Sequence, residues 1–416
     1  MKRILLLVFI FSFFALSKTS AQQRTCASFE AIKQEMKADP SYEKKINDNE
    51  KKFKEYVRSS ISARPQRIVI PVVVHVVYNT PEQNISDAQV QSQIDVMNED
   101  FTATNKDYNN YDAGYGAVRG DIDIKFCLAK VIHKATNKKS FGANDQVKSN
   151  SSGGSDPVDP MHFLNIWVCN LGQSLLGYAY YPGIKADKYG AVIHYMSFGR
   201  GAGYNLFPEY NLGRTVTHEV GHCLGLIHIW GDSKCGSDEV DDTPLHDVPN
   251  FGCPEHGLRS SCKGTPVEMT MNYMDYTDDK CMYFFTAGQA ARAQFFMDTD
   301  PQLNSIVNST CDRPGGNGNK ELITSINNSN GILRLAPDFS VYPTITTGQL
   351  NLSLNNVTQE KVEINIYSQA GSLMMKKQAA GKTLDQINVS SLSNGIYFIE
   401  VNQGASRQTR KFVVQH

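Results

Sequence analysis

The chain has 416 residues, and its 41 lysine and arginine residues are balanced by 42 aspartate and glutamate residues. The net charge of −1 gives no electrostatic reason to expect a nucleic acid or an anionic membrane as the main partner. Hydrophobic residues make up 41% of the chain, which excludes a wholly disordered protein. Nine cysteines, an odd number, leave at least one thiol outside intramolecular disulfides.

The N-terminus predicts a secretory signal peptide over residues 1–21. Lys2 and Arg3 precede an apolar run at 4–16, and a short polar stretch leads to Ala21. The run, of about 13 residues, is too short to span a bilayer comfortably, and no later stretch is long enough. We therefore expect no membrane span in the mature protein.

Residues 22–67 predict a propeptide. Lysine and glutamate are dense here, and Phe29, Ile32 and Met36 recur at helical spacing without enough apolar residues for a core of their own. The segment ends in a polar stretch punctuated by arginines, residues 58–67, which is suited to proteolytic cleavage.

Residues 68–311 alternate between predicted strands and helices, which indicates an α/β domain. The valine-rich run at 68–77 predicts a buried central strand, and Ser86 is the expected N-cap of a helix with Val90 and Ile94 on one face. Further strands are expected at 122–128, 163–168 and 191–195. We expect residues 191–197 to form an edge strand that binds extended substrate by main-chain pairing.

The C-terminal part divides into a linker and a second domain. Glycine, asparagine, serine and proline dominate residues 312–338, which is typical of a linker. Residues 339–416 contain short alternating runs separated by turn residues, which predicts a small all-β sandwich of the immunoglobulin-like kind.

The strongest motif lies between His218 and His228. His218 and His222, four residues apart, share one helix face, and Gly225 allows the chain to leave the helix so that His228 supplies a third ligand. Three histidines leave a zinc ion one open position, which is the arrangement of a catalytic site. Glu219 is placed to take a proton from zinc-bound water, so the motif predicts peptide-bond hydrolysis.

A second motif, Met271-Asn272-Tyr273-Met274-Asp275-Tyr276, follows the histidine motif. With these two motifs, residues 68–301 resemble the pappalysin family of metzincin zinc metalloproteases. The resemblance implies an α/β (α+β) metzincin-like catalytic domain with a twisted mixed sheet and an active-site helix. It implies that Met274 is the Met-turn residue and that Tyr276 hydrogen-bonds the zinc or the tetrahedral intermediate. Several pappalysins prefer a basic residue after the scissile bond. Asp278 and Asp279 would suit such a pocket, although Lys280 follows them.

The same resemblance assigns some of the cysteines and a calcium site. It implies disulfides Cys235–Cys262 and Cys253–Cys281, whereas Cys127, Cys169, Cys223 and Cys311 stay unassigned. It also implies structural calcium in the acidic loop that follows the zinc motif, where the alternative is a solvated loop. The expected ligands are Asp238 and Thr243, with Asp241 and, less well supported, Asp232.

Cys26 is the one cysteine of the predicted propeptide, and its thiolate would fill the open zinc position and keep a zymogen latent. A propeptide disulfide or an incidental thiol is the competing interpretation.

The C-terminal domain resembles the sorting domain of the type IX secretion system of Bacteroidetes, through segments such as Phe339-Ser340-Val341-Tyr342-Pro343 and Asn394-Gly395-Ile396-Tyr397. A carbohydrate- or protein-binding module is the alternative. The resemblance implies that the secretion machinery is a partner and that the protein reaches the medium or the cell surface through the periplasm of a Gram-negative bacterium.

The sequence therefore predicts a secreted zinc-dependent metalloendopeptidase that acts on proteins or peptides and is made as a latent zymogen. The alternative function is a non-catalytic surface adhesin or binding protein that retains a zinc-protease fold. An intact Glu219 argues against that alternative, because a purely structural zinc site does not need this carboxylate.

Overall fold

A computed structural model describes most of the chain. The described residues are 24–58, 68–110, 113–172, 175–255, 257–264, 267–311, 338–342, 345–355, 362–368, 372–379, 384–403 and 406–416. The predicted signal peptide, the stretch at 59–67 and residues 312–337 of the predicted linker lie outside them. No helix in the described part has the length and apolar character needed to cross a membrane.

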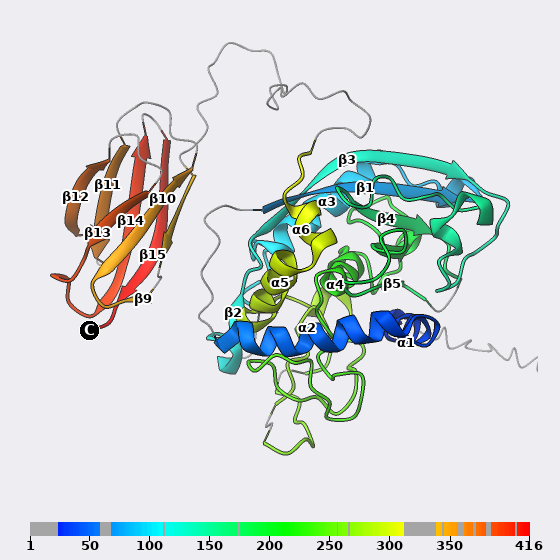
Figure 1. Ribbon diagram of the computed structural model, residues 1–416, viewed down its shortest axis with the longest axis horizontal. Coiled ribbons are helices and arrows are strands. Elements are labelled where there is room, and N and C mark those ends of the chain that lie inside the picture. The colour runs from blue at the N-terminus through cyan, green and yellow to red at the C-terminus, as the bar shows by residue number, and fades with distance from the viewer. Residues whose placement is uncertain are drawn as a thin grey trace, which may run out of the picture.

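A five-stranded mixed sheet forms the centre of the larger region (Figure 1). Its order is β3-β1-β4-β6-β5, with β1 (Ile68–Tyr78), β3 (Ile124–Ala135), β4 (Leu164–Cys169), β5 (Gly177–Ala179) and β6 (Ala191–His194). The first four strands in this order are parallel, and β5 pairs antiparallel with β6 at one edge. β1 lies between two parallel neighbours, which explains its nearly unbroken run of valine and isoleucine.

The prediction of an edge strand at residues 191–197 is wrong. Strand β6 ends at His194 and lies second from the edge, because the three-residue strand β5 pairs with it on the outer side. A strand this short, starting at Gly177, carries no alternating pattern from which the sequence could have placed it. The free edge beside the active-site helix is therefore β5.

Four helices pack on this sheet and on each other. Helix α3 (Asp87–Phe101) begins where predicted, since the side chain of its N-cap Ser86 accepts a hydrogen bond from the amide of Gln89. Helix α4 (Arg214–Cys223) contacts α3, β5 and β6. Helices α5 (Ala287–Thr299) and α6 (Pro301–Val307) follow, and a two-stranded ribbon of β2 (Arg119–Gly120) and β7 (Phe285–Thr286) precedes α5.

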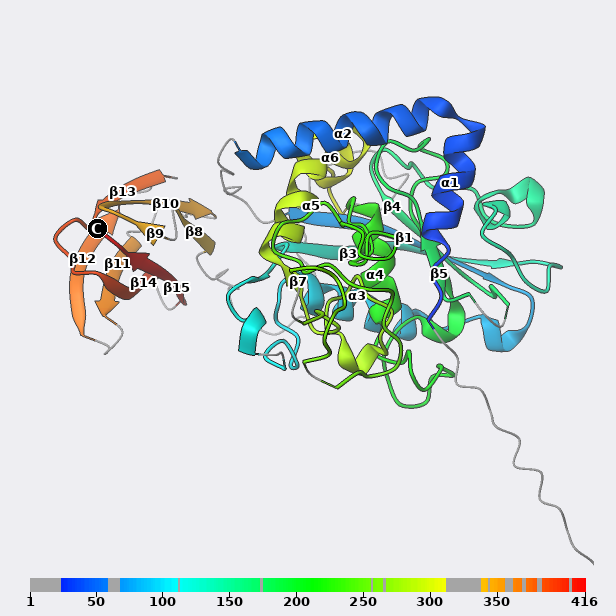
Figure 2. The same cartoon turned by 90° about the horizontal axis from the view of Figure 1, so that it is seen from below.

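Two N-terminal helices cover this region from outside (Figures 1 and 2). Helix α1 (Ser28–Ala38) lies against β5, and α2 (Pro40–Arg58) crosses α5. Their buried side chains Ile32, Tyr42 and Phe53 belong to the same apolar cluster as the sheet. The prediction of a helical segment without a core of its own is therefore confirmed.

Three disulfides cross-link the larger region. The bridges Cys235–Cys262 and Cys253–Cys281 are the two that the family resemblance implied. A third, Cys127–Cys311, joins β3 to the end of the region and accounts for two cysteines that the sequence left unassigned. The three free cysteines, Cys26, Cys169 and Cys223, are all buried.

The C-terminal region is all-β, as predicted. A three-stranded sheet (β13-β10-β8) and a five-stranded sheet (β12-β11-β14-β15-β9) share one buried apolar cluster. The strands are β8 (Asp338–Tyr342), β9 (Ile345–Thr346), β10 (Gln349–Asn355), β11 (Val362–Ser368), β12 (Leu373–Ala379), β13 (Leu384–Asn388), β14 (Gly395–Gln403) and β15 (Ser406–Val414). Eight strands are described here, and Asp338 already belongs to β8 rather than to the predicted linker.

Candidate active site

Helix α4 and the turn after it carry the three predicted metal-binding histidines. His218 and His222 lie one turn apart on α4, and all three histidine side chains are buried. The helix ends before Gly225, whose φ of +85° lies in the left-handed region. A Cβ on Gly225 would lie 2.2 Å from the ring of Phe296, so only glycine fits this turn, which brings His228 back to the helix.

Each of the three imidazoles is oriented through its Nδ1 atom. Nδ1 of His218 lies 2.8 Å from the carbonyl oxygen of Tyr273, and Nδ1 of His222 lies 2.8 Å from that of Leu226. Nδ1 of His228 lies 2.5 Å from Oδ1 of Asp232. Donation from Nδ1 in all three rings leaves every Nε2 as a lone-pair donor, which is how second-shell groups orient metal-binding histidines.

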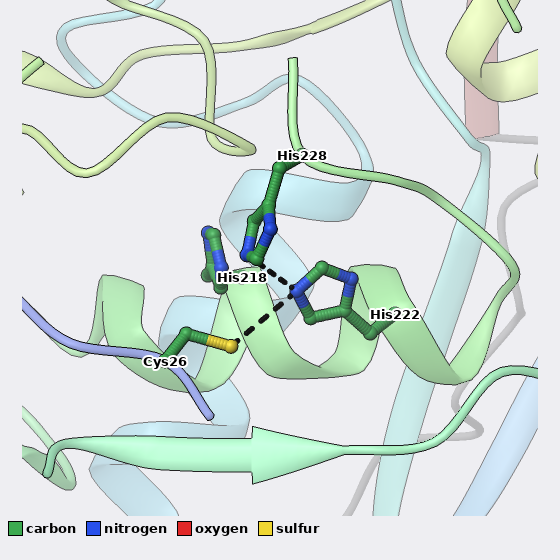
Figure 3. Close-up of side chains that lie close together, drawn as sticks. All are labelled: Cys26, His218, His222 and His228. Carbon is green, nitrogen blue, oxygen red and sulfur yellow. Dashed lines mark hydrogen bonds between the residues drawn. The ribbon is translucent and has the colours of Figure 1, made fainter. Parts of the chain in front are cut away.

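The three Nε2 atoms converge on one point (Figure 3). Nε2 of His222 lies 3.1 Å from Nε2 of His228, and Nε2 of His218 is buried without a hydrogen-bond partner among the described residues. Sγ of Cys26 lies 3.5 Å from Nε2 of His222, and one atom from each of these four residues lies within 4.8 Å of the others. Ligands about 2.1 Å from a shared tetrahedral ion would be about 3.4 Å apart, so this donor set fits zinc.

Burial sets the protonation of these ligands. It lowers the pKa of both His218 and His222 well below the usual range, so these rings stay neutral, as metal binding requires. Burial, followed by the nearby Glu219 carboxylate, raises the pKa of the Cys26 thiol well above its usual range. A cation between the histidines would act in the opposite direction and favour the thiolate.

Glu219 lies beside this cluster and is fully buried. Its Oε2 accepts a hydrogen bond from the hydroxyl of Ser28 at 3.0 Å and lies 3.3 Å from Sγ of Cys26. Burial raises the pKa of Glu219 to about 7. The N-terminal segment thus contacts both the metal-binding histidines and the adjacent carboxylate.

Met274 and Tyr276 both lie next to α4 and its histidines. Met274 is fully buried beneath α4, and a Cβ on Gly221 would lie 2.6 Å from its sulfur, so a glycine is needed for this contact. The ring of Tyr276 meets that of His228 edge-on, with centroids 5.0 Å apart. Its hydroxyl donates to the carbonyl oxygen of Cys26 at 3.0 Å, so the phenol is directed at a backbone carbonyl beside the histidines.

The N-terminal segment runs along the free edge of the sheet. The amide of Leu176 donates to the oxygen of Thr25 at 3.0 Å, and the amide of Ala27 donates to the oxygen of Gly177 at 3.1 Å. Cys26 and Gly177 form a parallel bridge, and the hydroxyl of Ser28 accepts from the amide of Ala179 at 2.8 Å. The N-terminal segment therefore pairs with β5 rather than with β6.

Two residues at this site were missed from the sequence, namely Ser28 and Arg24. The Arg24 side chain is buried, and its Nη2 forms an ion pair with Oδ1 of Asp279 at 2.6 Å. Its Nε donates to the oxygen of Thr277 at 3.1 Å, its Nη1 to the hydroxyl of Thr215 at 3.3 Å, and its guanidinium lies 5.0 Å from the ring centre of Tyr210. The one sequence feature that could have pointed to Arg24 is its position two residues before Cys26, the candidate zinc ligand.

The predicted calcium ligands separate into distinct places. Oδ1 of Asp238 accepts from the hydroxyl of Thr243 at 2.7 Å, whereas its buried Oδ2 has no hydrogen-bond partner in the described part of the chain. Burial raises the pKa of Asp238 to about 7, although the hydrogen bond from Thr243 and the charge of Arg292 act in the opposite direction. Asp232 is directed at His228, and Asp241 is exposed.

Comparison with known proteins agrees with this geometry. The family described as pregnancy-associated plasma protein-A matches residues 148–298, and the secretion system C-terminal sorting domain matches residues 340–415. An extracellular metalloprotease of Arthroderma gypseum is 30% identical over 304 residues, which cover 69% of this chain and 88% of that protein. One of Arthroderma benhamiae is 30% identical over 243 residues, 55% of this chain and 71% of that protein.

Solved structures of Tannerella forsythia proteins are also similar. A mutant of promirolysin is 40% identical with a TM-score of 0.63, covering 68% of this chain and 97% of that one. Mature mirolysin in complex with a cleaved peptide is 43% identical with a TM-score of 0.56, covering 59% and 97%.

Fold, site and relatives together define a metalloendopeptidase of the metzincin type, which implies a catalytic zinc. The chain belongs to the pappalysin family and carries a type IX secretion sorting domain. The sorting domain implies export from a Bacteroidetes-type bacterium to the cell surface or the medium.

Proposed function

We propose that this chain is the latent precursor of a zinc metalloendopeptidase in which Glu219 is the general base and acid. The observation that supports this most is the convergence of three Nε2 atoms, from His218, His222 and His228, next to the buried carboxylate of Glu219. When bound by these histidines, zinc would polarise the scissile carbonyl and lower the pKa of the attacking water.

The residues of the chain account for the proton transfers. Glu219 receives the proton of the attacking water on a carboxylate oxygen and passes it to the nitrogen of the leaving amine. Burial favours the protonated form of Glu219 and so makes its carboxylate a stronger base than an exposed one. The hydroxyl of Tyr276 donates to the substrate carbonyl oxygen as charge develops there, in place of its present contact with the Cys26 carbonyl.

Latency is proposed to come from residues 22–67 acting as a propeptide. With zinc bound, Cys26 would supply a fourth ligand, and Ser28 holds the carboxylate of Glu219, so one segment would block both parts of the catalytic machinery. The backbone of the same segment fills the edge β5, where a substrate would pair.

The substrate class is proposed to be proteins and peptides with a basic residue after the scissile bond. The buried site that now holds Arg24 offers the carboxylate of Asp279, a backbone oxygen and the ring of Tyr210 to a guanidinium. Of the two acidic residues considered from the sequence, Asp279 is the one that contacts Arg24 directly.

A structural calcium ion is proposed at Asp238 and Thr243. The unpartnered, buried Oδ2 of Asp238 supports a cation there, since hard cations take carboxylate and hydroxyl oxygens. Asp241 is exposed, and Asp232 already accepts from His228. Calcium should raise the unfolding temperature of the wild type but not of Asp238→Asn. An equal rise in both would place the ion elsewhere.

Export is proposed to depend on both ends of the chain. Residues 1–21 would direct the chain to the periplasm, 68–311 form the catalytic domain, 312–338 the linker and 339–416 an immunoglobulin-like sorting domain used by the secretion machinery. A truncation before residue 339 should leave the protein in the periplasm. Normal export of that truncation would refute the role of the sorting domain.

The central test combines Glu219→Gln with metal analysis. The processed protein should hydrolyse casein, and Glu219→Gln should lose activity by roughly 10³-fold or more while keeping its zinc, because the base is removed and the ligands stay. A zinc chelator should abolish wild-type activity. Full activity in Glu219→Gln would show that another residue is the base.

A further inference from the structure

Arg292 on α5 is a buried arginine that binds two segments of the chain. Its Nε donates to the carbonyl oxygen of Gly225 at 2.7 Å. Its Nη1 donates to Oε2 of Glu50 on α2 at 2.8 Å, and its Nη2 donates to Oε1 of the same carboxylate. The Arg292 side chain is 1% exposed and that of Glu50 is 20% exposed, so this bidentate pair is largely shielded from water.

Aromatic side chains from both partners surround this pair. The guanidinium of Arg292 lies 5.1 Å from the ring centre of Phe53 on α2 and 5.3 Å from that of Phe296 on α5. The buried Phe53 also meets Phe295, with centroids 5.5 Å apart. One turn further along α2, the ring of Tyr56 lies 5.4 Å from that of Phe295. The contact therefore joins a desolvated ion pair to an apolar patch, as binding hot spots do.

Arg292 cannot follow Glu50 if α2 moves away. Its Nε is held by Gly225, the glycine that turns the chain toward His228, and its guanidinium is flanked by Phe296. Departure of α2 would remove the bidentate carboxylate partner of both Nη groups and leave only the charge of Asp238 acting on the guanidinium. Replacing Glu50 while α2 stays in place would leave the buried guanidinium without that partner, which is strongly unfavourable.

This contact differs from the one at the metal centre. Arg24, Cys26 and Ser28 bind around α4 and β5, whereas Glu50, Phe53 and Tyr56 bind to α5. The helices α1 and α2 connect the two sets, so one segment holds the larger region at two places. Two linked contacts slow release, because the loss of either one leaves the other in place to rebind.

We propose that the α5 surface around Arg292 is a second anchoring site for the N-terminal segment. Cleavage within residues 59–67 would then not release residues 24–58, and the severed segment would stay bound as a non-covalent inhibitor until it is itself degraded. The inhibitory part of this inference rests on the proposed function, whereas the anchoring part does not. Activation would need a second event after the first cut.

The test uses the full chain with a specific protease recognition sequence replacing part of residues 59–67. Every variant also carries Glu219→Gln, so that the enzyme cannot digest its own fragment. After the chain is cut at the introduced site, native mass spectrometry and timed gel filtration after dilution measure how fast the N-terminal fragment leaves. The uncut variants are compared by thermal unfolding to confirm that each one folds.

Glu50→Gln should speed release of the fragment by about tenfold or more, since it breaks a charged, buried pair. The matched control is Glu55→Gln, because Glu55 is an exposed glutamate on the same helix, and it should change the release rate by less than about twofold. Phe53→Ala provides a second variant of the same contact and should also speed release. Equal release from Glu50→Gln and Glu55→Gln, or immediate release from the otherwise unchanged chain, would overturn the proposal.

A Cys26→Ser variant separates this proposal from the proposed latency. If Glu50→Gln speeds release and Cys26→Ser does not, the second site stands and the cysteine contact at the metal centre is the part that fails. If only Cys26→Ser speeds release, the metal centre is the sole anchor and the proposal about Arg292 is wrong.

Discussion

Arg24 and Asp279 form a buried ion pair, with 2.6 Å between Nη2 and Oδ1, that links the N-terminal segment to the start of the active-site helix. The other oxygen of the same carboxylate accepts from the amides of Leu212 and Arg214 at 2.9 and 3.1 Å, just where α4 begins. Asp279 therefore has a fixed orientation before any arginine binds. A carboxylate held in this way is preorganised to recognise a guanidinium.

Asp279→Asn should lower kcat/KM for substrates with arginine after the scissile bond by roughly 10- to 100-fold. The reason is that a buried guanidinium would lose its ionised partner. The measurement compares two peptides that differ only in arginine or leucine at that position. The leucine peptide should be cleaved at a nearly unchanged rate.

Asp278→Asn is the matched control, because Asp278 is the neighbouring acidic residue and the hydrogen bonds of Arg24 go to Asp279, Thr277 and Thr215 instead. It should keep the preference for arginine. Equal losses on both peptides in Asp279→Asn would mean that the carboxylate matters only for the start of α4. If only Asp278→Asn loses the preference for arginine, Asp278 rather than Asp279 determines the specificity.

Latency should weaken in steps when the contacts of the N-terminal segment are removed. Cys26→Ala should make the uncleaved precursor active, because the proposed fourth zinc ligand is removed. Ser28→Ala should give a smaller rise in activity, since Glu219 loses one hydrogen bond while the thiol stays. Activity is measured on a short peptide before any cleavage of the precursor, which is checked by mass spectrometry.

Ser41→Ala is a suitable control, because Ser41 is an exposed serine at the start of α2 whose hydroxyl donates to Oδ1 of Asp39 at 2.6 Å. It should remain fully latent. A Cys26→Ala precursor as inactive as the wild type would refute the cysteine switch and leave steric blockage of β5 as the explanation.

The sequence predicted the features that depend on local pattern. The spacing of His218, Glu219, His222 and His228 defined the site, and the valine-rich β1 and the Ser86 cap of α3 were placed to within one or two residues. Each of these is encoded by residues close together in the chain. The pairing of Cys235 with Cys262 needed the family resemblance, because four cysteines allow three pairings.

Features that depend on distant segments were missed. The bridge Cys127–Cys311 spans 184 residues, and nothing in either local sequence shows that these cysteines meet. Arg24 and Ser28 acquire their roles only when the N-terminal segment lies along β5. The edge strand was misplaced because the apolar run of β6 is the stronger pattern, whereas position in a sheet is set by the pairing of β5.

His75 gives a prediction for stability at acid pH. It is fully buried on β1, with Nδ1 2.8 Å from the hydroxyl of Ser155, Nε2 2.8 Å from Oδ1 of Asn165, and its ring stacked on Trp167. Burial lowers the pKa of His75 to about 4, with Lys130 acting in the same direction and the Asn165 bond and Asp156 opposing it.

The direction of the stability change with pH follows from proton binding. Between about pH 6.5 and 4 the unfolded chain binds a proton at this histidine and the folded chain does not, so stability falls as the pH falls through that range. From pH 7 to 5 this group alone should cost about 2 kcal/mol of unfolding free energy. Other buried histidines add to the loss, so the contribution of His75 must be isolated by substitution.

The measurement is urea unfolding at pH 7 and pH 5, followed by tryptophan fluorescence, for the wild type, His75→Gln and His133→Gln. His75→Gln should be less stable at pH 7 but should lose about 2 kcal/mol less than the wild type on going to pH 5, because glutamine does not titrate. His133→Gln is the surface comparison, at an exposed position on β3 where Nε2 lies 2.8 Å from Oδ1 of Asp87, and it shows how much the loss of a surface histidine changes the same measurement. If His75→Gln keeps the full pH dependence, the acid sensitivity arises at other buried groups, and the neutral state of His75 contributes nothing measurable to it.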